Sequence, residues 1–127
     1  MRLFLVRHAE AAPGDPDELR PLTEGGRAVA RALGEKLAGE HPDAVLSSPL
    51  LRARETAEQI ARAAEIEAEP DERLAPGATA DDIKAAIAGR GETVVAVAHQ
   101  PDCSAIVLEL TGRDIPFTAG AVYAVDL

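Results

Sequence analysis

The sequence predicts a single α/β domain, residues 1–127, in three α/β/α layers with a mainly parallel central sheet. Short apolar runs alternate along the chain with longer segments whose apolar positions recur every three or four residues. The runs are apolar at nearly every position, which is typical of strands buried on both faces. Strands that alternate with helices favour a parallel sheet covered by helices on both sides.

The composition limits the class of protein. An apolar share of 46% argues against a disordered chain, and a net charge of -9 argues against a nucleic-acid partner, which needs a basic face. No apolar run approaches the roughly 20 residues of a membrane span, and the apolar start is too short for a signal peptide. We therefore expect a cytoplasmic protein with no membrane partner. The single cysteine, Cys103, lies among small and apolar residues and is expected to be a buried, unreactive thiol.

The first third of the chain contains one strand and one helix. The strand is the continuous apolar run of residues 3–6, and the three prolines and one glycine of residues 11–21 predict a loop. A helix is expected over residues 24–38, because Thr23 can cap its start and apolar side chains recur every four residues. These side chains and the glycine that ends the helix are Val29, Leu33, Leu37 and Gly39.

The middle of the chain repeats this order. Residues 44–46 form a second short apolar strand, after which Ser48 is suited to cap a helix and Pro49 to begin it. That helix extends to about residue 64. Its apolar side chains share one face, at Leu50, Ala53, Ala57, Ile60, Ala61 and Ala64. A brief strand and a loop follow, at residues 66–69 and 70–77.

The last third of the chain contains two helices and two strands. Thr79 and Asp82 form a capping-box pattern for a helix that ends near Ala88. Residues 93–98 contain only threonine, valine and alanine and give the strongest strand signal in the chain. The final helix, its stop signal and the final strand are expected at residues 101–110, at Gly112 and at residues 121–125.

Three of the predicted strands end in residues that can bind an anion. The first leads into Arg7 and His8, the second into Ser48, and the fourth into His99. In a parallel sheet these ends meet at one edge, where ligands bind in α/β folds. Arg52 lies about one turn into the helix that starts there. Two arginines, two imidazoles and a helix N-terminus predict a pocket for a dianion such as phosphate.

Ordinary structural roles are the competing interpretation of the same residues. A single histidine at a strand end is more often structural than catalytic, and an arginine in the first turn of a helix usually faces solvent. His41 lies in a His-Pro loop with no convergent partner and is expected to be a surface residue. No metal site is expected, because two histidines and scattered acids lack the spacing of metal ligands.

The three segments resemble the motifs of a known family. Residues 5–10, Leu-Val-Arg-His-Ala-Glu, resemble the Arg-His-Gly opening of the histidine phosphatase superfamily, also called phosphoglycerate mutase-like. Residues 47–57 are similar to its second arginine motif, and residues 95–101 to its second histidine motif, in the family's order. The short chain and residues 20–23, Arg-Pro-Leu-Thr, are most similar to the SixA-type protein phosphohistidine phosphatases.

The resemblance implies a metal-independent phosphatase without a cofactor. His8 would attack phosphorus and carry the phosphoryl group as phosphohistidine, while Arg7, Arg52 and His99 would bind its oxygens. This agrees with the needs of phosphoryl transfer, which are positioning and neutralisation of charge. Two further candidates for phosphate contacts are Arg20 and Gln100.

The general acid is the least defined part of the predicted site. Many members of the family carry a glutamate in an inserted segment after the third strand, whereas residues 71–77 resemble the short SixA-type version. The candidate carboxylates are Asp17, Glu18 and Glu72. Alternatively no carboxylate serves, because an imidazole leaving group needs less protonation than an alkoxide, with a contribution from His99. The family's glycine after His8 is replaced by Ala9, a change that we expect the site to tolerate.

The missing insertion also bears on the substrate. Such a segment would form a lid that encloses a small molecule, and the chain has no stretch long enough for one. An open site favours phosphohistidine on a partner protein. Two alternatives remain: a phosphatase of small esters such as sugar or nucleotide phosphates, and a catalytically silent phosphopeptide-binding module that keeps Arg7 and Arg52 for binding.

Overall fold

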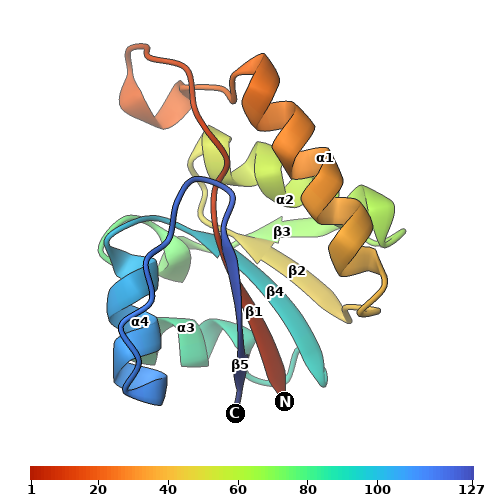
Figure 1. Cartoon of the computed structure of the whole chain (residues 1–127), viewed down its shortest axis with the longest axis vertical. Coiled ribbons are helices and arrows are strands. Elements are labelled where there is room, and N and C mark those ends of the chain that lie inside the picture. Colours follow the sequence, from red (N-terminus) through yellow and green to blue (C-terminus); the bar gives the residue numbers. More distant parts are fainter.

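In the computed structural model, which describes all 127 residues, five strands form one sheet between two pairs of helices (Figure 1). The strands are β1 (Arg2–Arg7), β2 (Ala44–Ser47), β3 (Ala68–Pro70), β4 (Thr93–Ala98) and β5 (Val122–Asp126). The helices are α1 (Glu24–Ala38), α2 (Leu51–Ala63), α3 (Ala80–Ile87) and α4 (Asp102–Thr111). Two short 3-10 turns are η1 (Asp17–Leu19) and η2 (Glu72–Leu74).

Four of the five strands are parallel, as predicted. The strand order is β3-β2-β4-β1-β5, and only β5 runs antiparallel, along the outer side of β1. The register of β1 on β4 runs from Arg2 beside Thr93 to Arg7 beside Ala98. The carboxyl ends of β1, β2 and β4 therefore meet at one edge of the sheet, while the two chain termini lie at the opposite edge (Figure 1).

Side chains of β1 alternate between the two helical layers. Leu3 and Leu5 pack with α3 and α4 in a cluster of 17 buried residues. Phe4 and Val6 pack with α1 and α2 in a second cluster of 11. A strand that is covered by helices on both faces has no solvent-exposed face, which explains why nearly every residue of β1 is apolar. The two cores confirm the three-layer prediction.

The start of α2 differs from the prediction by two residues. The helix begins at Leu51 rather than at Pro49, and no side chain caps it. The Ser48 hydroxyl accepts a hydrogen bond from the backbone N–H of Leu50 at 3.2 Å, which closes a turn before the helix. Ser48 therefore shapes the entry to α2 but is not its cap.

Two smaller differences have local causes. Residues 66 and 67 precede β3, because the backbone N–H of Ile66 still donates to the Ala61 carbonyl at the end of α2. Val29 is 46% exposed, although its spacing predicts burial. The buried face of α1 is centred next to Val29 and does not include it. The buried residues of this helix are Gly26, Ala30, Leu33, Gly34 and Leu37. None of the helices has both the length and the apolar character of a membrane span.

The helices α1 and α2 are in close contact at Gly34. An added Cβ at this position would lie 2.7 Å from the carbonyl oxygen of Gln59 in α2. At Gly25, in the first turn of the same helix, the nearest atom would be 3.9 Å away. The packing of α1 on α2 therefore requires glycine at one position and tolerates a side chain at the other.

We expect Gly34→Ala to lower the free energy of unfolding by about 1–3 kcal/mol, because the added methyl group must push the two helices apart. Gly25→Ala is the matched control and should be neutral, or stabilising by up to ~1 kcal/mol, since alanine is the better helix former. Urea unfolding followed by circular dichroism measures both. Equal stabilities of the two variants would contradict the close contact.

Candidate active site

Four residues predicted from the strand ends lie together at the carboxyl edge of the sheet. Arg7 is the last residue of β1 and His8 follows it, while His99 follows β4. Arg52 is the second residue of α2, the helix that comes after β2. The rings of His8 and His99 face each other edge to face, with 5.2 Å between their centroids. The site is therefore built from three adjacent strands.

The His8 ring is oriented by the backbone of its neighbour. Its Nδ1 lies 2.7 Å from the carbonyl oxygen of Ala9. A carbonyl oxygen only accepts, so Nδ1 carries the proton of the neutral ring and Nε2 keeps its lone pair. Burial lowers the pKa of His8, against the effect of the Ala9 hydrogen bond, and the charges of Arg52 and Arg7 lower it further. At neutral pH the ring is a neutral imidazole with a free nucleophilic nitrogen.

Thr56 ties the loop after β1 to the first turns of α2. The backbone N–H of Ala9 donates to the Thr56 hydroxyl at 3.1 Å, and this hydroxyl donates to the Arg52 carbonyl at 2.9 Å. Both Ala9 and Thr56 are fully buried. The link holds His8 and Arg52 in a fixed relation. Sequence analysis assigned no role to Thr56, although it lies within residues 47–57 and is a polar residue on the apolar face of a predicted helix.

His99 is held by Ser48, which the sequence predicted as a helix cap at a strand end but not as a partner of His99. Its Nε2 lies 2.8 Å from the Ser48 hydroxyl oxygen, and both residues are buried. Burial, followed by the charges of His8 and Arg52, lowers the pKa of His99 to about 4. His99 is therefore neutral at neutral pH. It can donate or accept a hydrogen bond without adding charge to the site.

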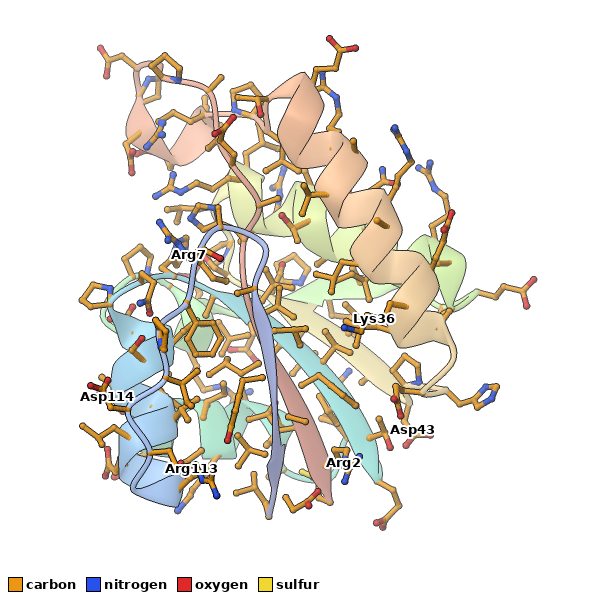
Figure 2. All side chains as sticks on the ribbon, viewed as in Figure 1. Arg2, Arg7, Lys36, Asp43, Arg113 and Asp114 are labelled. Carbon is orange, nitrogen blue, oxygen red and sulfur yellow. The ribbon has the colours of Figure 1, made fainter.

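Arg7 brings an unsatisfied donor to the site. Its Nη1 donates to the carbonyl oxygen of Phe117 at 3.0 Å. Phe117 lies in the segment between α4 and β5 and is buried in the 17-residue core cluster. The Nε of Arg7 is buried and has no hydrogen-bond partner. Figure 2 shows Arg7 at the end of the sheet opposite to Arg2 and Asp43. A buried donor without a partner is costly, and an anion bound at this edge would satisfy it.

Arg52 is engaged by Asp17 of η1. Its Nη1 donates to the Asp17 carbonyl oxygen at 2.9 Å, and its Nη2 donates to the Asp17 carboxylate at 3.2 Å. The other carboxylate oxygen accepts from Arg20 at 3.0 Å. Hydrogen bonds from Arg20 and Arg52 lower the pKa of Asp17. This side chain is a carboxylate at neutral pH, whereas a general acid must carry a proton.

The other candidates make no hydrogen bond to the four site residues. Glu18 is exposed on η1. Glu72 is exposed in η2 and lines a separate hollow of about 330 Å³ near the start of α3. The Gln100 side-chain amide donates to the Ser104 hydroxyl at 2.8 Å and accepts from the Ser104 backbone N–H at 2.9 Å, so it is used within the first turn of α4. The structure thus brings together the two histidines and two arginines and leaves these three residues outside.

The site has no hollow of its own: Arg7 and His8 are half-buried, and Arg52 and His99 are buried. The largest surface hollow, about 440 Å³, lies at the corner of α2 and β3, and none of the four site residues lines any hollow. Only β3, η2 and α3 lie between α2 and β4, so no lid is inserted there. No group of three or more His, Cys, Asp and Glu side chains is placed to hold a metal ion. Such an edge can bind and orient a phosphoryl group that protrudes from a larger molecule.

Comparison with known proteins gives consistent matches. Residues 3–76, which include Arg7, His8 and Arg52, match the family model described as histidine phosphatase superfamily (branch 1). An uncharacterized protein of Picosynechococcus sp. (strain ATCC 27264 / PCC 7002 / PR-6) is 36% identical over 130 residues, covering 91% of this chain and 78% of that protein. Phosphoserine phosphatase 1 of Hydrogenobacter thermophilus is 37% identical over 83 residues, covering 58% of this chain and 37% of that protein.

A solved structure matches the whole chain. The protein histidine phosphatase SixA, in complex with tungstate, superposes with a TM-score of 0.88 at 31% identity. The match covers 100% of this chain and 88% of that one, so it includes His99, which lies beyond the segment matched by the family model.

The half-buried His8 and the buried His99 make stability depend on pH. Both have a pKa below that of an unfolded histidine, so the unfolded chain binds more protons than the folded one between pH 6.5 and about 4. We expect the free energy of unfolding to be fully retained above pH 6.5 and to fall as the pH drops through this window. Urea unfolding at a series of pH values measures the slope.

Two variants show which histidine causes the pH dependence of the free energy of unfolding. His99→Asn removes one buried titrating group and should flatten the slope, while the same change at the exposed His41 should preserve it. A free energy of unfolding that does not change with pH across the window would contradict the burial of the neutral imidazoles.

Proposed function

Because the chain belongs to the histidine phosphatase superfamily (branch 1), we propose that it hydrolyses phosphohistidine on a partner protein through a phosphohistidine intermediate at His8. The family and the likeness to SixA make the chain a phosphatase. The proposal adds the substrate, the covalent intermediate and the independence from metal.

The observation that carries the proposal is the state of the His8 ring. Its Nδ1 is committed to the Ala9 carbonyl at 2.7 Å, which leaves Nε2 free beside His99 and two arginines. A neutral imidazole nitrogen held among cationic donors is suited to attack phosphorus, because the donors neutralise the phosphoryl oxygens. The unpartnered Nε of Arg7 supports the same assignment.

The proposed reaction has two displacements. His8 Nε2 forms a bond to phosphorus as the bond from phosphorus to the substrate imidazole breaks. Water then attacks phosphorus, the bond to Nε2 breaks, and inorganic phosphate leaves with His8 restored. Arg7 and Arg52 supply positive charge in both steps, and neutral His99 contributes a hydrogen bond. Phosphoryl transfer depends mainly on such positioning and charge, so the proposed reaction needs no metal ion.

A phosphohistidine substrate also suits the lack of a protonated carboxylate at the site. Asp17 is held as a carboxylate by two arginines, and neither Glu18 nor Glu72 bonds to the site residues. A departing imidazole leaves as a neutral molecule when its other ring nitrogen carries a proton. That nitrogen can take the proton from solvent, because an imidazole has a pKa of ~6.5, so no carboxylic acid has to protonate the breaking bond. An alkoxide from an ester depends far more on a general acid. The chemistry of the site therefore supports a phosphoramidate as substrate.

The absence of an inserted lid between α2 and β4 supports a protein substrate over an enclosed small molecule. A second candidate is a phosphatase of small phosphate esters, favoured by the similarity to phosphoserine phosphatase 1 over 58% of this chain. The third, a silent phosphopeptide-binding module, would keep Arg7 and Arg52 without turnover. The oriented lone pair of His8 argues for catalysis instead.

The first test compares specificity constants for phosphate release from two kinds of substrate. One is a protein phosphorylated on histidine, and the other is a panel of sugar, nucleotide and amino-acid phosphate esters, all with a chelator present. We expect a much higher kcat/KM on the phosphoprotein, no loss with the chelator, and covalent phosphate on the wild-type protein. His8→Ala should fold normally and lose both turnover and covalent phosphate.

Other results of this comparison would favour one of the alternative functions or overturn the assignment of His8. A preference for an ester keeps the nucleophile and replaces the substrate. Phosphate binding without turnover on either substrate indicates the binding module. Full activity of His8→Ala in a clean preparation overturns the assignment of the nucleophile.

Arg52 should serve both binding and chemistry. We expect Arg52→Ala to lower kcat/KM by about 10²–10³-fold and to weaken inhibition by inorganic phosphate, because one guanidinium contacts the anion in the ground state and the transition state. Arg62→Ala, on the exposed side of the same helix, is the matched control and should stay close to wild type. Unchanged phosphate inhibition in Arg52→Ala would remove Arg52 from the proposed site.

A further inference from the structure

The tip of the loop before α1, residues 13–19, carries η1. Within this tip, only Asp17 forms hydrogen bonds to α2. Its backbone hydrogen bonds run from Leu19 to Pro16 and from Arg20 to Asp17, all within the loop, and no residue of η1 is buried. The base of the loop is closed separately, by the bridge between Ala11 and Leu22. The hydrogen bonds that join this tip to α2 both come from Arg52 to Asp17. Figure 1 shows this loop extending beyond the carboxyl end of the sheet.

Asp17 holds only one end of the Arg52 guanidinium. The backbone carbonyl takes Nη1 at 2.9 Å and the carboxylate takes Nη2 at 3.2 Å, so both bonds use the far end of the group. The Nε of Arg52 has no partner in the protein. Arginine binds phosphate best through two parallel N–H groups on one edge. Because Asp17 holds the Arg52 guanidinium through Nη1 and Nη2, the edge that carries Nε stays available to bind phosphate.

The same carboxylate also bonds a second guanidinium. Its other oxygen accepts from Arg20 Nη1 at 3.0 Å, and Arg20 Nε donates to the Ala12 carbonyl at 2.9 Å. Three of the bonds around Asp17 therefore fix the direction of two cations. The Asp17 side chain is 60% exposed. An exposed ion pair adds little to the free energy of unfolding. The main effect of these ion pairs is therefore to orient the Arg20 and Arg52 side chains.

We propose that Asp17 is a positioning residue, whose carboxylate holds the far end of Arg52 so that the Nε edge of the guanidinium meets the phosphoryl group. This inference rests on the proposed function. Asp17 acts through Arg52 and not as a proton donor. The expected cost of its loss follows from orientation, since a small misplacement of a catalytic group can reduce the rate by as much as ~10²-fold.

The test measures the affinity for inorganic phosphate by calorimetry and kcat/KM on a histidine-phosphorylated protein. We expect Asp17→Ala to weaken phosphate binding and to lower kcat/KM by about 10–100-fold, with a smaller loss for Asp17→Asn. The melting temperature of Asp17→Ala should stay within ~4 °C of the wild-type value. Asp15→Ala is the matched control, because it removes the same charge from the same loop at an exposed residue without a hydrogen bond.

A double-mutant cycle separates a positioning role from an independent one. In the Arg52→Ala background, Asp17→Ala should cause little further loss of phosphate affinity, because the residue through which it acts is gone. Independent losses that multiply would overturn the proposal. So would tighter phosphate binding by Asp17→Ala, which would mean that the carboxylate competes with phosphate for Arg52. Loss of kcat on esters with phosphate affinity unchanged would instead identify Asp17 as the general acid.

These outcomes are distinct from failure of the proposed function. If the wild-type protein binds phosphate in an Asp17-dependent way but prefers an ester, the positioning role stands and the substrate changes. If the phosphoprotein is hydrolysed and Asp17→Ala behaves like Asp15→Ala, the positioning role fails alone. If wild type binds no phosphate, both fail.

Discussion

The burial of the neighbouring strands β1 and β4 along nearly all of their length is the constraint on which the site depends. Both strands are covered by helices on both faces, so neither can place a polar side chain along its length without leaving it unpaired. Polar residues can appear only where the strands leave the core. Parallel pairing of β1 with β4 puts these exits side by side, and His8 and His99 meet there as a result.

The same burial sets the charge of the site. Two imidazoles at the margin of the core remain neutral, because desolvation is the largest cause of the lowered pKa of each. The positive charge is carried by arginines, which stay charged at any physiological pH. Nucleophile and electrostatic stabiliser are thus separate side chains. In a chain of net charge -9, the Asp17 carboxylate lies between Arg52 and the neighbouring Arg20 and limits the local excess of positive charge.

The sequence was sufficient to predict features that depend on neighbouring residues. The strands, the Thr23 cap and the Thr79–Asp82 capping box follow from local patterns, and the structure contains them. Parallel topology then brought Arg7, His8, Arg52 and His99 to one edge. These four were predictable because each lies at or near a strand end.

Features that depend on distant partners were not predictable. Ser48 has the pattern of a helix cap, but its hydroxyl lies beside His99, 51 residues away in the chain. Val29 has helical spacing, but α1 turns its glycine and alanine side toward α2. Asp17 was identified as a carboxylate near the site without any indication that Arg52 would hold it. In each case the missing information is which groups the tertiary fold brings into contact.

The two ends of the chain join at the edge of the sheet opposite to the site. Backbone groups of Met1 and Leu127 exchange hydrogen bonds of 3.0 and 2.8 Å, so the polypeptide is almost a closed ring. A short peptide linker can close this ring without crossing the domain. The fold of residues 1–127 is therefore suited to circular permutation, with new ends opened in an exposed loop, and a carrier fused next to Met1 or Leu127 stays clear of a large substrate docked over His8.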